Sequence, residues 1–187
     1  MLFILKRHWT SALLGLAVLI LMGLIIRAFQ LGPPVGLSPR AVGFGCVVVA
    51  VVLFSDAAIH GLLCLFWGAE YRRRQLELAQ VFRGQSLVAI LFGALMAGVG
   101  EELVFRGGSL APMYLLGGAV VFGLLHHIRR ELWPFTLWAV WQGLLFATAI
   151  YVTEMLCVTM VAHFLHDFIG FLIFRYLNRP DWSAKKS

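Results

Sequence analysis

Long apolar stretches, separated by short polar segments, run through the whole chain. A helix needs about 20 apolar residues to cross the roughly 30 Å hydrocarbon core of a bilayer, because it rises about 1.5 Å per residue. Six stretches meet or approach this length and predict transmembrane helices at residues 9–29, 41–69, 86–110, 113–128, 133–152 and 155–177. The sequence therefore predicts an all-α, polytopic integral membrane protein. Residues 1–187 are expected to form a single membrane domain with a conical or bundle-like core that holds an intramembrane polar site.

Composition supports a membrane location. Hydrophobic residues make up 61% of the chain and charged residues 13%, against roughly 45–50% and about 25% in soluble globular domains. This much apolar surface requires the lipid bilayer as a partner. The three cysteines have neither the spacing of a zinc site nor that of a disulfide framework.

The net charge of +6 reflects basic clusters between the apolar stretches. Cytoplasmic segments of membrane proteins are enriched in Lys and Arg, so both termini are predicted to be cytoplasmic. Basic residues do not alternate with aromatic residues on one face, so no nucleic-acid partner is expected. With this orientation, 12 of the 15 basic residues lie in cytoplasmic segments: Lys6, Arg7, Arg72, Arg73, Arg74, Arg83, Arg129, Arg130, Arg175, Arg179, Lys185 and Lys186.

Two adjacent carboxylates occur within the predicted helix 86–110. A charged group near the bilayer centre costs at least about 2.5–3.5 kcal/mol, so such residues pair, line a wet cavity or take part in chemistry. Glu102 and Arg106 are four residues apart and can pair on one helix face. Glu101 then points in another direction and is the candidate general base. The alternative is a buried charge network that only holds helices together.

Imidazoles occur in two later stretches. His126 follows Phe122 by four residues and can act as a base, a donor or a metal ligand. His163 and Asp167 share a helix face, so the carboxylate can orient the imidazole. If the chain reverses near residues 112–113, Glu101, His126 and His163 reach a similar depth, whereas a reversal at 107–108 would separate Glu101 from His126.

Asp56 and His60 are also four residues apart, in the predicted helix 41–69. They either line the same polar cavity or satisfy each other in the core. The second interpretation is favoured on the sequence alone.

Together these segments resemble the motifs of the CAAX-protease and bacteriocin-processing family of intramembrane endopeptidases. That family shows Glu-Glu-x-x-x-Arg, Phe-x-x-x-His and His-x-x-x-Asn/Asp in this order. Here the motifs are Glu101-Glu102-x-x-x-Arg106, Phe122-x-x-x-His126 and His163-x-x-x-Asp167. The segment between Arg106 and His126 is short for the family.

The resemblance implies an enzyme that hydrolyses a peptide bond of a membrane-anchored peptide or protein substrate. Glu101 and His126 would activate water, and His163 and Asp167 would line the oxyanion side. Glu102, Arg106 and Phe122 would support the site. An ionised Asp167 would repel an oxyanion, so it must be protonated or must act by orienting His163.

A mechanism without a cofactor is favoured, with zinc held by Glu101, His126 and His163 as the metal-dependent alternative. The resemblance also suggests a bacterial or archaeal cell membrane. The substrate is either a prenylated tail, a peptide precursor or a protein cut near its C-terminal anchor. The alternative functions are a non-catalytic immunity or scaffold protein of the same family, and a proton-coupled transporter.

Overall fold

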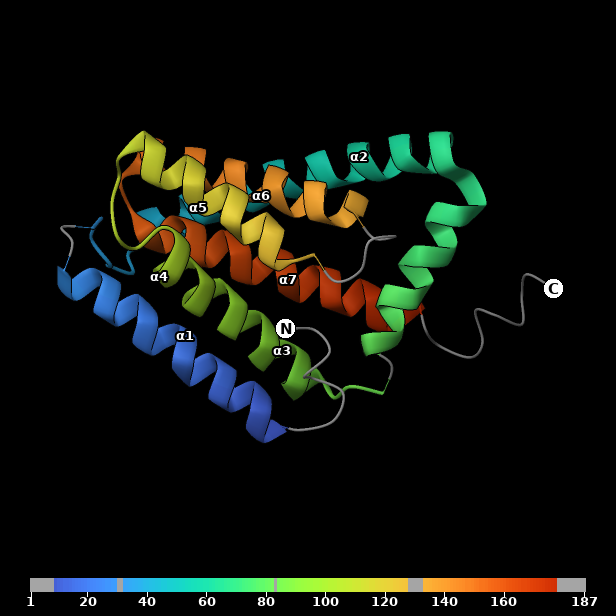
Figure 1. Cartoon of the computed structure of the whole chain (residues 1–187), viewed down its shortest axis with the longest axis horizontal. Helices are drawn as coiled ribbons and strands as arrows, with labels where there is room; N and C mark the ends of the chain where they lie inside the picture. Colours follow the sequence, from blue (N-terminus) through green and yellow to red (C-terminus); the bar gives the residue numbers. More distant parts are fainter. Residues whose placement is uncertain (1–8, 30–31, 83, 128–132, 178–187) are drawn as a thin grey trace.

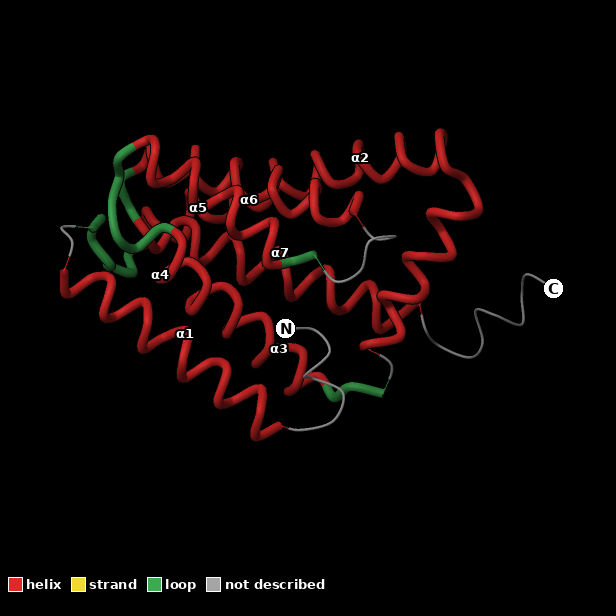
Figure 2. The backbone as a smooth tube through the Cα atoms, in the orientation of Figure 1, coloured by secondary structure: helices red, strands yellow, loops and turns green. Residues whose placement is uncertain are grey.

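The computed structural model describes residues 9–29, 32–82, 84–127 and 133–177. All regular structure in these residues is helical, as Figure 2 shows. Each of the six predicted stretches contains a helix. The helices are α1 (Trp9–Phe29), α2 (Pro39–Ala79), α3 (Leu87–Met96), α4 (Glu102–Phe105), α5 (Pro112–Leu125), α6 (Trp133–Thr153) and α7 (Leu156–Leu177), with a 3₁₀ turn η2 (Gln80–Phe82) and a π turn η3 (Ala97–Glu101).

The prediction of an all-α polytopic membrane protein is confirmed. Four helical segments are long and apolar enough to cross a membrane: Pro39–Ala79, Leu87–Phe105, Trp133–Thr153 and Leu156–Tyr176. Two shorter apolar segments, Ala17–Phe29 and Pro112–Leu125, belong to α1 and α5.

Helix α2 continues beyond the predicted end at residue 69. Gly68 adopts a left-handed φ of 50° and divides the helix into two arms. The second arm contains Arg73, which forms exposed ion pairs with Glu70 and Glu77. This polar arm was expected to be part of a connecting segment, and i, i+3 and i, i+4 ion pairs explain why it is helical instead.

Helix α7 lies at the centre of the bundle. It packs against α2, α3, α6 and the π turn η3, as Figure 1 shows. Phe82 of η2 stacks on Phe171 and Phe174, so the second arm of α2 returns to the C-terminal part of α7. The loops at 32–38 and 106–111 lie at the same end of the bundle (Figure 2). Most of the basic residues used to predict the orientation lie outside the described residues, and the cytoplasmic termini stay a prediction.

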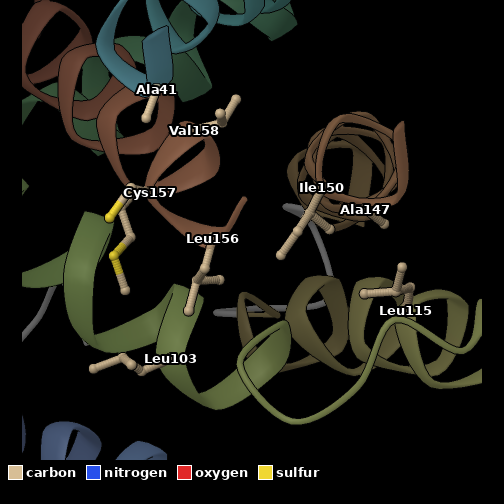
Figure 3. Close-up of a cluster of buried hydrophobic side chains, with 9 residues drawn as sticks. Ala41, Leu103, Leu115, Ala147, Ile150, Leu156, Cys157 and Val158 are labelled. Atoms are coloured by element: carbon tan, nitrogen blue, oxygen red, sulfur yellow. The ribbon is translucent and has the colours of Figure 1, made fainter. Parts of the chain in front are cut away.

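An apolar cluster joins the helices at one end of the bundle. Figure 3 shows Leu156 and Val158 of α7 near Ile150 of α6, together with Leu115 of α5 and Leu103 of α4. Large apolar side chains also cover the outside of the molecule, and Phe54, Leu65 and Val88 are among the most exposed. Exposed apolar side chains in this number are expected where lipid is the solvent.

Glycines allow the helix backbones to approach closely. A Cβ atom on Gly45 would lie 2.7 Å from the side chain of Val161, and one on Gly123 would lie 2.7 Å from the backbone nitrogen of Val140. Small residues have this role in many membrane helix interfaces. These contacts join α2 to α7 and α5 to α6.

Gly98, in the π turn, makes a contact of the same kind with α7, one residue from His163. A Cβ atom there would lie 2.7 Å from the backbone nitrogen of Phe164. We expect Gly98→Ala to lower the free energy of unfolding by about 1–3 kcal/mol, because a backbone neighbour cannot move aside as a side chain can. The matched control is Gly117→Ala, in α5, where nothing lies within 4 Å of the added carbon. Unfolding in mixed detergent micelles measures the free energy of unfolding of both variants. An equal loss of stability in Gly98→Ala and Gly117→Ala would contradict the prediction.

Candidate active site

The three motif segments meet where α7 passes the π turn and the middle of α6, at Gly143 and Phe146. The π turn ends at Glu101, and α4 begins at Glu102. Wide turns of this kind are rare and frequently occur at functional sites. Gly98 lets α7 approach the turn closely, which brings His163 next to both carboxylates.

Glu102 and Arg106 form the predicted ion pair, and both side chains are completely buried. Arg106 Nη1 donates to Glu102 Oε1 at 2.6 Å, and Nη2 donates to the carbonyl of Gly143 at 3.2 Å. The guanidinium also lies over the rings of Phe122 and Phe146, at 4.9 and 5.6 Å from their centroids. The pair therefore fixes α4 against α5 and α6.

The same Glu102 oxygen accepts a second hydrogen bond, from His163. The distance from Nδ1 is 2.8 Å. Nε2 of this imidazole lies 3.6 Å from Asp167 Oδ2 and 3.9 Å from Glu101 Oε2. The sequence suggested that Asp167 orients His163, but the hydrogen bond that holds the ring is the one its Nδ1 donates to Glu102. Phe146 stacks on one side of the ring, with the centroids 5.0 Å apart.

Glu101 is 5% exposed and points away from Arg106, toward Nε2 of His163. The 3.9 Å contact is too long for a hydrogen bond. The two adjacent carboxylates therefore have different surroundings. Glu102 is fixed by two donors, whereas Glu101 is a buried carboxylate without a comparably close partner among the described residues.

His126 lies at the C-terminal end of α5. Its Nδ1 donates to the carbonyl of Phe122 at 2.7 Å, which leaves Nε2 available. The Phe122 ring touches both imidazoles, with centroids 4.5 Å from His126 and 5.7 Å from His163. His126 lies within electrostatic range of Glu101 and Asp167, but outside ion-pair distance of either carboxylate.

The connection between α4 and α5 differs from the expected reversal at residues 112–113. Helical structure ends at Phe105, and α5 begins at Pro112. His126 nevertheless shares the site region with His163, because α5 packs against α4 and α6 and brings Phe122 between the two imidazoles. The depth argument from the sequence was therefore wrong in its premise about the turn.

The sequence missed a second polar cluster beside Asp167. His166 Nδ1 lies 3.0 Å from Asp167 Oδ1, and its Nε2 lies 2.7 Å from Asp56 Oδ2 and 2.9 Å from Gln142 Nε2. Asp56 Oδ1 also accepts from Trp138 Nε1 at 2.6 Å, and both of its oxygens accept from Gln142 Nε2 at 3.2–3.3 Å. A glutamine in the middle of the apolar stretch of α6 was the signal that could have revealed this cluster.

The favoured pairing of Asp56 with His60 is wrong. His60 Nδ1 lies 3.3 Å from the hydroxyl of Tyr71, and its Nε2 lies 3.5 Å from Cys64 Sγ. The kink at Gly68 returns the chain so that Tyr71 reaches this histidine. The other interpretation, in which both residues line the polar site, holds for Asp56, which joins the cluster around His166, and not for His60.

The donor set does not fit the zinc alternative. Within residues 9–29, 32–82, 84–127 and 133–177, no three His, Cys, Asp or Glu side chains are grouped to hold a metal ion. Glu101, His126 and His163 surround a region without converging on a single point, so no mechanistic step is assigned to zinc.

Comparison with known proteins gives one family match. Residues 83–169 match the model of the Rce1-like family, described as type II CAAX prenyl endopeptidase Rce1-like. The matched segment includes all three motifs and most of the residues around the site. No curated protein and no solved structure gives a significant match.

Proposed function

We propose, from the match of residues 83–169 to the Rce1-like family of type II CAAX prenyl endopeptidases, that the chain belongs to this family and is an intramembrane endopeptidase. It hydrolyses a peptide bond of a membrane-associated or lipid-anchored substrate by activating water with Glu101 and His126. The observation that carries this proposal is the contrast between two neighbouring carboxylates. Glu102 is neutralised by Arg106, while Glu101 is buried and remains available to take a proton.

The proposed reaction begins with a water molecule between Glu101 and Nε2 of His126. Glu101 takes a proton from this water as its oxygen attacks the carbonyl carbon of the scissile bond. His126 accepts the second water hydrogen and holds the nucleophile in line. Its Nδ1 bond to the Phe122 carbonyl favours the tautomer that leaves Nε2 as an acceptor.

The oxyanion is proposed to form on the side of His163. Nδ1 of that imidazole donates to Glu102, so Nε2 carries a proton only when the ring is an imidazolium. In the proposed reaction His163 is therefore the cation, and its Nε2–H donates a hydrogen bond to the developing negative charge without giving up the proton. The proton held by Glu101 then passes to the leaving amine as the carbon–nitrogen bond breaks. All atoms and protons are thereby accounted for by the peptide, the water and these side chains.

The proposed partners are the lipid bilayer and a membrane-anchored peptide or protein, with the termini of the chain in the cytoplasm. The exposed apolar surface supports the first partner, because lipid is the solvent that such a surface requires. A prenylated tail, a peptide precursor and a protein cut near its anchor remain the three substrate classes to compare.

Cleavage of a peptide panel representing these classes, by purified protein in lipid vesicles, tests the proposal. We expect His126→Gln to slow cleavage by about 10²–10⁴-fold, the usual contribution of a residue that handles the reacting proton. His127→Gln is the matched control, because this adjacent imidazole bonds to Thr136 instead. Addition of a chelator is expected to leave cleavage unchanged.

Two outcomes would contradict the proposal. Equal cleavage by wild type, His126→Gln and His127→Gln would show that the site lies elsewhere. Proton flux in sealed vesicles that depends on Glu101, without cleavage of any peptide, would favour the proton-coupled transporter instead.

A further inference from the structure

The site places a carboxylate where negative charge develops in the proposed reaction. Asp167 Oδ2 lies 3.6 Å from Nε2 of His163, and the Asp167 side chain is 16% exposed. An unneutralised carboxylate at this position would disfavour an oxyanion held by the same imidazole nitrogen. Another group must therefore offset its charge.

His166 is placed to do this. Its two ring nitrogens lie 3.0 Å from Asp167 Oδ1 and 2.7 Å from Asp56 Oδ2. An imidazole that donates from both nitrogens carries both protons and a positive charge. Gln142 Nε2 also lies 2.9 Å from His166 Nε2, and an amide nitrogen can only donate. When the ring carries both protons, Nε2 donates to Asp56 rather than accepting from Gln142. The ring then bridges the two carboxylates as a cation and contacts the Asp167 oxygen that is not the one near His163.

Asp56 holds His166 from the opposite side. Asp56 is 9% exposed, and its carboxylate accepts hydrogen bonds from Trp138 and Gln142. These bonds between α2 and α6 hold the carboxylate in place independently of its contact with α7. They also fix the position of the Asp56 oxygen that contacts Nε2 of His166. Other titratable groups near Asp167 include His163, His126 and Glu101, and Glu102 binds the opposite nitrogen of His163.

We propose that His166, held between Asp56 and Asp167, is a positioning residue that neutralises Asp167 so that the latter can sit beside His163 without opposing the oxyanion. This inference rests on the proposed function. It explains why an ionised aspartate is compatible with the site. It also extends the site to Asp56 of α2, which lies outside the matched residues 83–169.

A double-mutant cycle at positions 166 and 167 tests the inference. His166→Gln is expected to reduce the cleavage rate by roughly 10–100-fold, the usual effect of losing a residue that orients a reacting group. In the Asp167→Asn background, where no charge needs to be offset, the same substitution should cost less than about 3-fold. Asp167→Asn thus rescues the loss at position 166. Equal losses in the two backgrounds would overturn the inference.

Unfolding measurements on the same four proteins separate the outcomes. The matched control is His60→Gln, which removes a half-buried imidazole outside the cluster and should leave the cleavage rate unchanged. If the two substitutions are coupled in stability but not in rate, His166 only holds helices together and the positioning role is overturned. If wild type cuts no peptide, the proposed function fails. The unfolding free energies of the four proteins still test the charge pairing of His166 with Asp167, because additive effects of the two substitutions would refute that pairing.

Discussion

Replacing Glu101 by Gln is expected to reduce peptide cleavage by about 10²–10⁴-fold, the range associated with loss of a general base. The amide has nearly the same shape as the carboxylate but cannot take the proton of the attacking water. Folding should be preserved, because Arg106 and His163 both bind Glu102 rather than Glu101. The free energy of unfolding is expected to stay equal or to rise, since a buried charge without a close partner is removed.

Glu70→Gln is the matched control for this measurement. Glu70 lies on the second arm of α2 and pairs with Arg73 and Arg74 at the surface. Single-turnover cleavage in lipid vesicles and unfolding in mixed micelles should both show little change for this variant. Full activity of Glu101→Gln would refute the assignment of the base. Loss of activity together with loss of fold would instead make Glu101 a structural residue.

The helices could be predicted from the sequence because lipid imposes a simple rule on composition. Long apolar runs identified α6 and α7, and the start of α2, to within a few residues. The spacing of Glu102 and Arg106 correctly identified an ion pair. Both inferences depend only on local periodicity, which the sequence contains in full.

Contacts between distant segments could not be predicted in the same way. Asp56 was paired with His60 because they are neighbours on one helix face, yet its partner His166 is 110 residues away. The rotation of each helix about its own axis decides which of its polar residues meet a neighbouring helix. Close contacts between helices, such as Gly45 against Val161, set this rotation. The π turn at residues 97–101 likewise changes the direction of Glu101, and local periodicity does not indicate it.

The second large effect is expected at Arg106. Replacing it by Met should lower the free energy of unfolding by about 3–5 kcal/mol, because Glu102 would remain as an uncompensated buried charge. Oε2 of Glu102 is buried and has no hydrogen-bond partner among the described residues, so the carboxylate relies on the donors at its other oxygen. Arg73→Met, which breaks exposed pairs, is the control and should cost no more than about 1 kcal/mol.

The double variant Glu102→Leu with Arg106→Met separates stability from activity. Replacing both partners of a buried pair by apolar residues is often neutral or stabilising, so most of the lost stability should return. Cleavage should not return, because His163 would lack the carboxylate that accepts its Nδ1 proton at 2.8 Å. Recovery of both properties would mean that the pair is only a structural element. Recovery of stability alone would show that Glu102 links the buried arginine to the orientation of the oxyanion-side imidazole.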